Sequence, residues 1–334
     1  MQRPIVVVTD SPFPNLDPAR KVLSNINAVI RLVENSTPDG IAEATQDADG
    51  VLVTYAKIGA EAIRQMKRCR IISRFGIGVD NVDISAATDA GIVVTRVPDY
   101  CIDEVSDHTL ALLLAVARKI PLANSLVHSG RWELSATVPI HRLRGSILGL
   151  VGFGRIPQLV APKAAAFGLK VITSDPYVSP EVLARAGVEP CDFAELVKLS
   201  DYISLHTPLL EETHHLFNAD VFLNMKPTAY LINTARGPII DEHALAVALD
   251  RGQLAGAALD VLSQEPPTGS PLFGRSNVIL TPHMSFYSDE SLVDLQVKAA
   301  EEVVRAMSGE GPRNPVNPEA CKGKILKTTA PEGR

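Results

Sequence analysis

The sequence lacks several features that mark particular protein classes. Its four cysteines, Cys69, Cys101, Cys191 and Cys321, show none of the close paired spacing of a zinc site or a disulfide framework. We therefore predict reduced thiols, no metal site and a cytoplasmic protein. No stretch approaches the roughly 20 consecutive apolar residues of a membrane-spanning helix. The apolar run at residues 5–8 is too short for the core of a signal peptide.

An excess of positive charge is also missing. The 334 residues include 32 lysines and arginines and 38 aspartates and glutamates, which gives a formal net charge of −6 at pH 7. Because a protein that grips nucleic-acid phosphates needs a basic stripe, we predict no nucleic-acid partner and no membrane partner. The composition, 46% hydrophobic and 21% charged, is that of a globular protein, and the length accommodates two domains of ordinary size.

Short runs rich in valine and isoleucine alternate along the chain with longer segments of helical period. This alternation is typical of β-α units on a parallel sheet, and nearly continuous apolar runs are typical of strands that are covered on both faces. We therefore predict an α/β fold. The predicted strands are residues 5–8, 51–55, 70–74, 92–95, 146–151, 170–173, 202–206, 229–233 and 277–280.

Two long helices are predicted as well. Residues 101–120 carry acidic side chains in the first turn and basic ones in the last, which matches the helix dipole. The second half of this segment is apolar around nearly its whole circumference, so we predict a helix buried between elements at a domain boundary. The other long helix is predicted at 289–307. The polar segment after it, rich in glycine, proline and lysine, is predicted to be mobile for most of its length.

A glycine turn follows one of the predicted strands. Gly152 and Gly154 precede a helical pattern, and Asp175 stands at the end of the next strand, 23 residues beyond Gly152. Such a turn binds the diphosphate of a dinucleotide on free N–H groups at the helix start, here those of Arg155 and Ile156. Asp175 is placed to bind the ribose hydroxyls and would repel a 2′-phosphate. We therefore predict binding of NAD in preference to NADP.

The third glycine of this turn is missing, and Pro157 occupies its position. A proline in the first helical turn gives up an N–H that has no partner within the helix, so we predict a working phosphate site on a slightly displaced helix. Pro162 falls inside the helix, where it removes a hydrogen bond, and we predict a kink at 158–162. The alternative is a glycine turn that binds nothing, against which Asp175 argues.

Three further strand ends are followed by polar or charged residues, which include Arg236, Asp260, Glu265 and His283. Ligands bind at the carboxyl ends of strands in parallel sheets. Transfer of a hydride to a carbonyl leaves an alkoxide, which needs a proton donor near neutral pH, and His283 suits that role. Arg236 can hold a carboxylate and polarise the carbonyl. Glu265, if it contacts the imidazole, would favour the protonated form.

Each of these residues also has an ordinary structural interpretation. Arg236 could belong to a surface ion pair, His283 could be a loop histidine with satisfied hydrogen bonds, and Glu265 could be solvated before the two prolines that follow it. Their joint position at strand ends beside a nucleotide turn favours the catalytic interpretation.

Three other histidines could suggest sites. His108, with Asp107 and Glu104, could be drawn as a metal cluster, but adjacent side chains on a helix diverge, so we predict no metal there. His214 and His215 lie in a polar connection and are predicted to be solvated.

Seven motifs, taken together, resemble those of the D-isomer-specific 2-hydroxyacid dehydrogenases over nearly the full chain, and most closely their C-terminal-binding-protein-like branch. The motifs are "RFGIGVDNVDI", "VPDYCIDEVSDHTLALLLA", "LGLVGFGRI", "SLHTPLLEETHHLFN", "NTARGPIID", "ALDVLSQEPP" and "TPHMSFYS". The resemblance implies two doubly wound parallel-sheet domains. One is a Rossmann-type nucleotide domain at 99–288, and the other is a flavodoxin-like, discontinuous substrate domain at 1–98 and 289–334, largely irregular from about 310. It also implies a homodimer formed through the nucleotide domain, with the 101–120 helix involved.

The same resemblance assigns roles to individual residues. It implies that Arg236 binds the substrate, that Glu265 is the partner of the histidine, and that His283 is the acid/base. It further implies that the backbone amides of Ile77 and Gly78 help to bind the substrate carboxylate. Residues implied to contact the cofactor, besides those of the glycine turn, are Thr207, Pro208, Thr234, Arg236, Asp260 and His283, with Asp260 holding the nicotinamide amide.

One position departs from the branch that the chain resembles most. Phe286 stands where the C-terminal-binding proteins have a tryptophan against the substrate, so their substrate preference does not carry over.

We predict an NAD-dependent D-2-hydroxyacid dehydrogenase that reduces a small 2-keto acid by hydride transfer from NADH, with His283 as the proton donor. Two alternatives stay open. The first is an NAD(H)-responsive binding protein that resembles the corepressors and has little turnover. The second is a phosphoglycerate dehydrogenase, which needs a phosphate-binding group that the sequence does not identify and usually carries regulatory domains that we expect this length not to accommodate.

Overall fold

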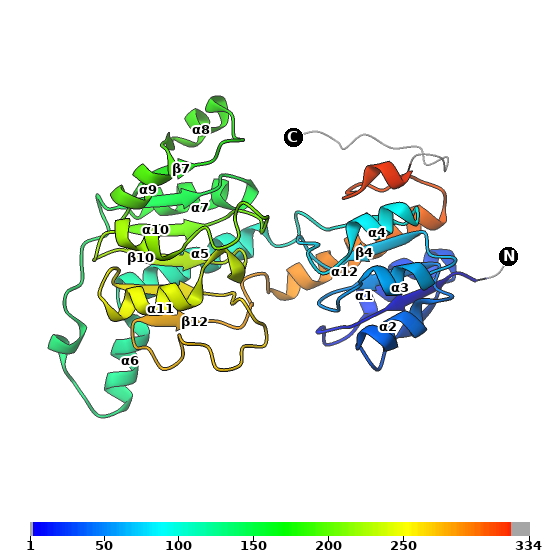
Figure 1. Ribbon diagram of the computed structural model, residues 1–334, viewed down its shortest axis with the longest axis horizontal. Coiled ribbons are helices and arrows are strands. Elements are labelled where there is room, and N and C mark those ends of the chain that lie inside the picture. The colour runs from blue at the N-terminus through cyan, green and yellow to red at the C-terminus, as the bar shows by residue number, and fades with distance from the viewer. Residues whose placement is uncertain (1–2, 322–334) are drawn as a thin grey trace. The chain divides into compact units, whose positions relative to one another are not determined.

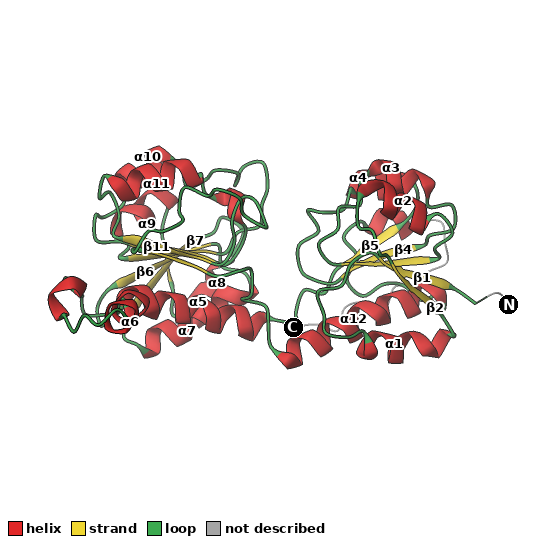
Figure 2. Cartoon of the chain, turned by 90° about the horizontal axis from the view of Figure 1, so that it is seen from below, coloured by secondary structure: helices red, strands yellow, loops and turns green. Residues whose placement is uncertain are grey.

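The chain forms two compact units, each built on its own parallel sheet. A computed structural model describes residues 3–321 (Figure 1). One unit comprises the residues up to Tyr100 together with those from Ser288 on, and the other comprises Cys101–Tyr287. In each unit, helices cover both faces of the sheet, as Figure 2 shows.

The first unit has a five-stranded sheet in the order β2-β1-β3-β4-β5, with every pair parallel. This is the flavodoxin-like order of a doubly wound sheet. Its strands are β1 Ile5–Val8, β2 Val29–Leu32, β3 Gly50–Val53, β4 Ile71–Arg74 and β5 Val93–Thr95. Its helices are α1 Asp17–Leu23, α2 Pro38–Thr45, α3 Ala60–Gln65, α4 Ile84–Asp89 and α12 Asp289–Met307, with short 3-10 turns at Ser24–Ile26 and Pro318–Cys321.

The second unit has a seven-stranded parallel sheet in the order β12-β11-β10-β9-β6-β7-β8. Its strands are β6 Ile147–Val151, β7 Lys170–Ser174, β8 Glu189–Pro190, β9 Tyr202–Leu205, β10 Tyr230–Asn233, β11 Gly256–Leu259 and β12 Val278–Leu280. Its helices are α5 Ile102–Ala117, α6 Ile120–His128, α7 Arg155–Ala166, α8 Pro180–Ala186, α9 Phe193–Leu199, α10 Ala219–Asn224 and α11 Glu242–Asp250, with 3-10 turns at Leu134–Thr137 and Gly237–Ile239. The strand order reverses between β6 and β9, as in a Rossmann-type sheet. The predicted fold class, two doubly wound parallel sheets, is confirmed.

The burial of the strand residues explains which strands could be predicted from the sequence. All residues of β3, β9 and β11 are buried, because helices cover both faces of each sheet. Continuous apolar runs are the signature of such strands. β11 was anticipated only as the strand end before Asp260, and two strands, β2 and β8, were missed. Both lie at sheet edges: β2 is half exposed, and both residues of β8 are exposed. β2 and β8 bury too little surface to require an apolar run, whereas β5, which is also an edge strand, is buried throughout and was predicted.

The predicted helix at 101–120 is shorter than expected. α5 ends at Ala117, and Lys119 adopts a left-handed conformation with φ 52°, after which α6 begins at Ile120. α5 packs on α7, β10 and β11 within its own unit, which explains its apolar circumference. Within residues 3–321, no one helix is long and apolar enough to cross a membrane. α5 and α6 pass that test of length and composition only as a pair, with a bend of 60° between them.

α12 has the predicted boundaries, and the segment after it is more ordered than predicted. Val316 donates its N–H to the carbonyl of Val94 on β5 at 2.8 Å. The side chain of Asn317, which is fully buried, accepts from the N–H of Val94 at 2.7 Å and donates to the carbonyl of Ile92 at 3.0 Å. The prediction of mobility is therefore wrong as far as residue 321, and residues 322–334 lie outside the described part of the chain.

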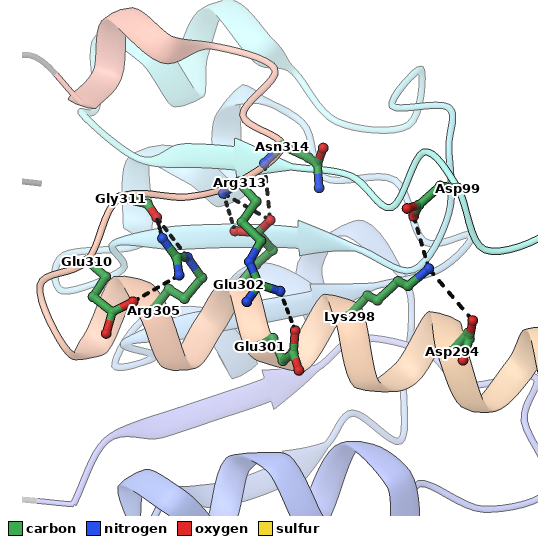
Figure 3. A network of polar contacts seen from close by, with 10 residues as sticks. All are labelled: Asp99, Asp294, Lys298, Glu301, Glu302, Arg305, Glu310, Gly311, Arg313 and Asn314. Atoms are coloured by element: carbon green, nitrogen blue, oxygen red, sulfur yellow. Dashed lines mark hydrogen bonds and ion pairs between the residues drawn. The ribbon is translucent and has the colours of Figure 1, made fainter. Parts of the chain in front are cut away.

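A buried carboxylate on α12 holds the start of this segment (Figure 3). Glu302 is 3% exposed, and its oxygens accept from the N–H groups of Arg313 and Asn314 at 3.0–3.1 Å. Burial raises the pKa of Glu302, although these two N–H groups act to lower it. The buried carboxylate thus accepts from two partly buried backbone N–H groups of the segment that follows α12.

Replacement of Glu302 by alanine is expected to lower the free energy of unfolding of the first unit by about 1 kcal/mol, because two partly buried N–H groups lose their acceptor. Glu302→Gln keeps an acceptor oxygen and removes the buried charge, so it should be close to wild type at pH 7. The control is Glu301→Ala, which removes only a surface ion pair to Arg313. Urea unfolding measures all three, and an alanine variant at 302 that is no less stable than the variant at 301 would contradict the account.

Candidate active site

The glycine turn lies between β6 and α7. Gly152 has φ +92°, and a Cβ at this position would stand 3.1 Å from the carbonyl group of His206, so glycine is required on both counts. Gly154 is the N-cap of α7, and a Cβ there would have no atom within 4 Å. The turn therefore leaves open space at the start of the helix, where the backbone can approach a ligand closely.

The two prolines are accommodated within α7. Pro157 is buried and is the third residue of the helix, so the N–H groups of Arg155 and Ile156 precede it. The first helical hydrogen bond joins the N–H of Gln158 to the carbonyl of Gly154 at 3.2 Å. The helix runs unbroken through Pro162, and the kink at 158–162 stays a prediction.

Two groups beside the turn fit a dinucleotide. The Asp175 carboxylate accepts from the N–H of Phe153 at 2.7 Å and from that of Tyr177 at 2.8 Å, which fixes it next to the turn with lone pairs left for hydroxyl donors. The hydroxyl oxygen of Thr207 is buried and has no hydrogen-bond partner among residues 3–321. Its methyl group would lie 3.2 Å from a Cβ at Gly152. An orphaned buried hydroxyl at such a turn is what a bound ligand would satisfy.

His283 and Glu265 form a close pair in the loops that follow β12 and β11. The Nδ1 atom of His283 is 2.7 Å from Oε2 of Glu265, and Oε1 of Glu265 accepts from the N–H of Leu262 at 3.0 Å. Burial acts to raise the pKa of Glu265. The hydrogen bond and charge of His283, the Leu262 N–H and the charge of Arg236 act the other way, and the net pKa is lowered. The carboxylate therefore stays ionised and favours an imidazolium beside it.

The turn that carries His283 is folded around Asp260, which is 1% exposed. Oδ1 of Asp260 accepts from the Thr281 hydroxyl at 2.6 Å and from the N–H of Met284 at 2.9 Å, and Oδ2 accepts from the N–H of Ser285 at 2.9 Å. The N–H of His283 donates to the carbonyl of Asp260 at 2.8 Å. His283 has φ 51°, a conformation that costs a non-glycine residue energy and persists where neighbours over-determine it. Asp260 supplies those neighbouring hydrogen bonds.

Arg236 follows β10 in a loop whose backbone is held by the side chain of Asn233. The buried Asn233 side chain donates to the carbonyl of Arg236 at 2.8 Å and accepts from the N–H of Ala235 at 2.9 Å. A Cβ at Gly237 would stand 2.0 Å from the carbonyl carbon of Leu262, so only glycine allows this approach. The loops of Arg236 and Glu265 are thereby pressed together.

The other predicted site residues occupy the following places. The Thr234 hydroxyl is 3.0 Å from that of Thr109 on α5, and the carbonyl of Pro208 accepts from the Thr213 hydroxyl at 2.7 Å. Ile77 and Gly78 are half-buried in the turn after β4, in the first unit.

Three aromatic side chains near predicted sites can also be placed. Phe286 packs edge-on against His283, with ring centroids 6.1 Å apart. His214 and His215 are exposed, as predicted, and their rings are stacked.

The sequence analysis assigned no role to His108, which lies beside Thr281 and Asp260. Nε2 of His108 is 3.2 Å from the Thr281 hydroxyl and 3.6 Å from Oδ1 of Asp260. The available signal was helical spacing, because His108 lies three residues after Val105 and four before Leu112, both of which are buried. That spacing could have placed His108 on the inner face of its helix, but it indicates no partner.

Comparison with known proteins identifies the family. Residues 110–285 match the NAD binding domain of the D-isomer specific 2-hydroxyacid dehydrogenases. The chain is 37% identical over 326 residues to D-3-phosphoglycerate dehydrogenase of Methanocaldococcus jannaschii, which covers 96% of this chain and 61% of that protein. It is 39% identical over 288 residues to glyoxylate reductase of Thermococcus litoralis, and the match covers 84% of this chain and 87% of that protein. The structure of D-lactate dehydrogenase from Aquifex aeolicus with NAD and lactic acid superimposes with a TM-score of 0.83 at 28% identity. The match covers 98% of this chain and 100% of that one.

The chain therefore belongs to the D-isomer specific 2-hydroxyacid dehydrogenase family, which confirms the resemblance found in its motifs. It contains the NAD binding domain of that family. It spans about 61% of the length of the D-3-phosphoglycerate dehydrogenase that it matches.

Proposed function

We propose that this chain is an NAD-dependent dehydrogenase that reduces a small 2-keto acid to the D-2-hydroxy acid. The observation that carries the proposal is the His283–Glu265 pair, 2.7 Å apart, in loops at the carboxyl edge of a nucleotide-type sheet, with the charge of Arg236 close enough to lower the carboxyl pKa. The similarity to a glyoxylate reductase and a D-lactate dehydrogenase supports the same class of substrate.

In this proposal the bound NADH supplies the hydride that reduces C2 of the keto acid. Arg236 would bind the substrate carboxylate with two parallel hydrogen bonds and polarise the carbonyl. The backbone amides of Ile77 and Gly78 stay proposed substrate ligands, as the motifs imply. His283 donates a proton to the carbonyl oxygen as the hydride arrives, so that the C=O group becomes CH–OH and the imidazole is left neutral. Glu265 stabilises the protonated imidazole before transfer, and solvent returns the proton afterwards.

The residues of the glycine turn would hold the cofactor. The N–H groups of Arg155 and Ile156 would bind the diphosphate, and Asp175 would bind the adenosine ribose and disfavour a 2′-phosphate. The unpaired hydroxyl of Thr207 would gain a partner. Contacts from Pro208, Thr234, Asp260 and other residues at this sheet edge are part of the same proposal.

The proposal is tested by incubating purified protein with NADH and each of glyoxylate, hydroxypyruvate, pyruvate and phenylpyruvate. We expect at least one of them to be reduced by the wild type at a rate that His283→Ala abolishes. Absence of any oxidation that depends on His283 would refute the proposal. Tight NADH binding without turnover, together with capture of a protein partner, would instead favour the corepressor-like alternative.

Phosphoglycerate dehydrogenase stays the second candidate, because the D-3-phosphoglycerate dehydrogenase of M. jannaschii matches 96% of this chain. Oxidation of D-3-phosphoglycerate with NAD as the acceptor distinguishes it. A rate with this substrate above that of every unphosphorylated 2-hydroxy acid would establish the second candidate over the first.

Exposed apolar residues support a proposed homodimer through the nucleotide domain. Trp132 is 89% exposed and Leu134 is 79% exposed, and Ile120, Val127 and Val138 nearby are exposed too. α6 and the turn that follows it project from their sheet in Figure 1. Large exposed apolar patches mark interaction surfaces. Light scattering should give twice the 35.8 kDa mass of one chain, and a monomer mass at micromolar concentration would contradict the proposal.

A cytoplasmic location is also proposed, and it rests on the cysteines. All four are thiols in the structure, as expected for a reducing compartment.

The pH dependence of the reaction should report the Glu265–His283 pair. Reduction needs a protonated imidazole, so the rate should fall at alkaline pH. Glu265→Gln removes the negative charge beside the imidazole, and the fall should then occur at lower pH. The measurement is kcat against pH for both proteins, and a midpoint that does not move would contradict the role of Glu265.

A further inference from the structure

His108 belongs to none of the roles assigned so far, and its surroundings suggest one. It lies on α5, its side chain is largely buried, and Nε2 contacts Thr281 and Asp260 as described above. α5 packs against α7, β10 and β11, so the imidazole stands on a rigid element beside the turn that carries His283.

The direction of each hydrogen bond in this cluster can be deduced. Asp260 accepts from the N–H groups of Met284 and Ser285, as an ionised carboxylate does, so the 2.6 Å contact from Thr281 must use the hydroxyl proton of Thr281. A hydroxyl has only one proton. The Thr281 hydroxyl can therefore only accept a hydrogen bond from His108, so Nε2 of His108 must carry a hydrogen. The chain of donors runs from His108 to Thr281 to Asp260.

We propose that His108 is a positioning residue for the reaction: by donating from Nε2 it fixes the rotamer of Thr281 and thereby the Asp260 carboxylate around which the His283 turn is folded. This inference rests on the proposed function for its effect on catalysis. Without the imidazole, the Thr281 side chain can rotate and its hydroxyl loses one of two partners. The carboxylate then loses its shortest hydrogen bond, and the left-handed conformation of His283 loses part of its support.

Two substitutions separate hydrogen bonding from packing. His108→Leu fills similar space without a donor, whereas His108→Gln retains an N–H₂ group that can reach Thr281. The control is His243→Leu, at an exposed position on α11. We expect His108→Leu to lower kcat about tenfold, as loss of residues that orient a reactive group commonly does, with the affinity for NADH changed less than about threefold. His108→Gln should recover most of that loss.

A second readout does not depend on turnover. Amide hydrogen exchange at His283, Met284 and Ser285 should be faster in His108→Leu than in wild type, and near normal in His108→Gln and His243→Leu, with equal thermal midpoints in all four proteins.

These readouts distinguish failure of the inference from failure of the proposed function. Wild-type kcat and wild-type exchange in His108→Leu would overturn the inference, as would equal losses in the leucine and glutamine variants. A wild-type protein that reduces no keto acid would refute the proposed function, and the exchange rates alone would then decide the role of His108.

Discussion

Replacement of His283 by alanine is expected to lower kcat for keto-acid reduction about a thousandfold, because the alkoxide formed by hydride transfer loses its proton donor. NADH should still bind with nearly unchanged affinity, since the diphosphate and the adenosine ribose are assigned to the glycine turn and Asp175. Steady-state kinetics and fluorescence titration of NADH measure the two quantities.

The matched control for this variant is His243→Ala, which removes an exposed imidazole of the same unit. It should retain wild-type kcat. A His283 variant that keeps more than a tenth of wild-type kcat at neutral pH would show that the proton comes from elsewhere.

Replacement of Arg236 by glutamine should have an effect of similar size. The guanidinium is assigned both to the substrate carboxylate and to the carbonyl oxygen on which charge develops, so we expect kcat/KM to fall about a thousandfold, with KM raised and kcat lowered. Arg236→Lys keeps the charge but not the two parallel hydrogen bonds, and it should lie between the glutamine variant and wild type.

The control for Arg236 is Arg251→Gln, at the exposed C-cap of α11. If Arg236→Gln raised KM for NADH instead of KM for the keto acid, the assignment of Arg236 to the substrate would be wrong.

Most of the strands could be anticipated because burial on both faces leaves its mark on the sequence. β3, β9 and β11 are buried throughout, and each coincides with an apolar run or ends in a residue singled out from the motifs. β2 and β8 have no fully buried residue, which is why they were missed. The conformation of residues 309–321 depends on Glu302 and on the N–H and carbonyl groups of Val94 in β5. These partners are distant in sequence, and no local pattern encodes them.

For the candidate site, the sequence singled out residues but not the contacts that hold their loops. Spacing after strands identified Arg236, Glu265 and His283, because parallel strands deliver their carboxyl ends to one edge. The mutual distances of these side chains depend on contacts between loops, such as the approach of Gly237 to Leu262. The part played by His108 was hidden for the same reason, since its partners come from a strand end more than a hundred residues later.

The central claim is that hydride passes from the nicotinamide to C2 of a keto acid while His283 protonates its oxygen. The most direct test uses NADH that carries deuterium at both C4 positions, with NMR analysis of the product. The account predicts a D-2-hydroxy acid with one deuterium on C2 from the wild-type protein, and no labelled product from His283→Ala in the same time. An unlabelled product, an L-2-hydroxy acid, or equal labelling by the His283 variant would contradict it.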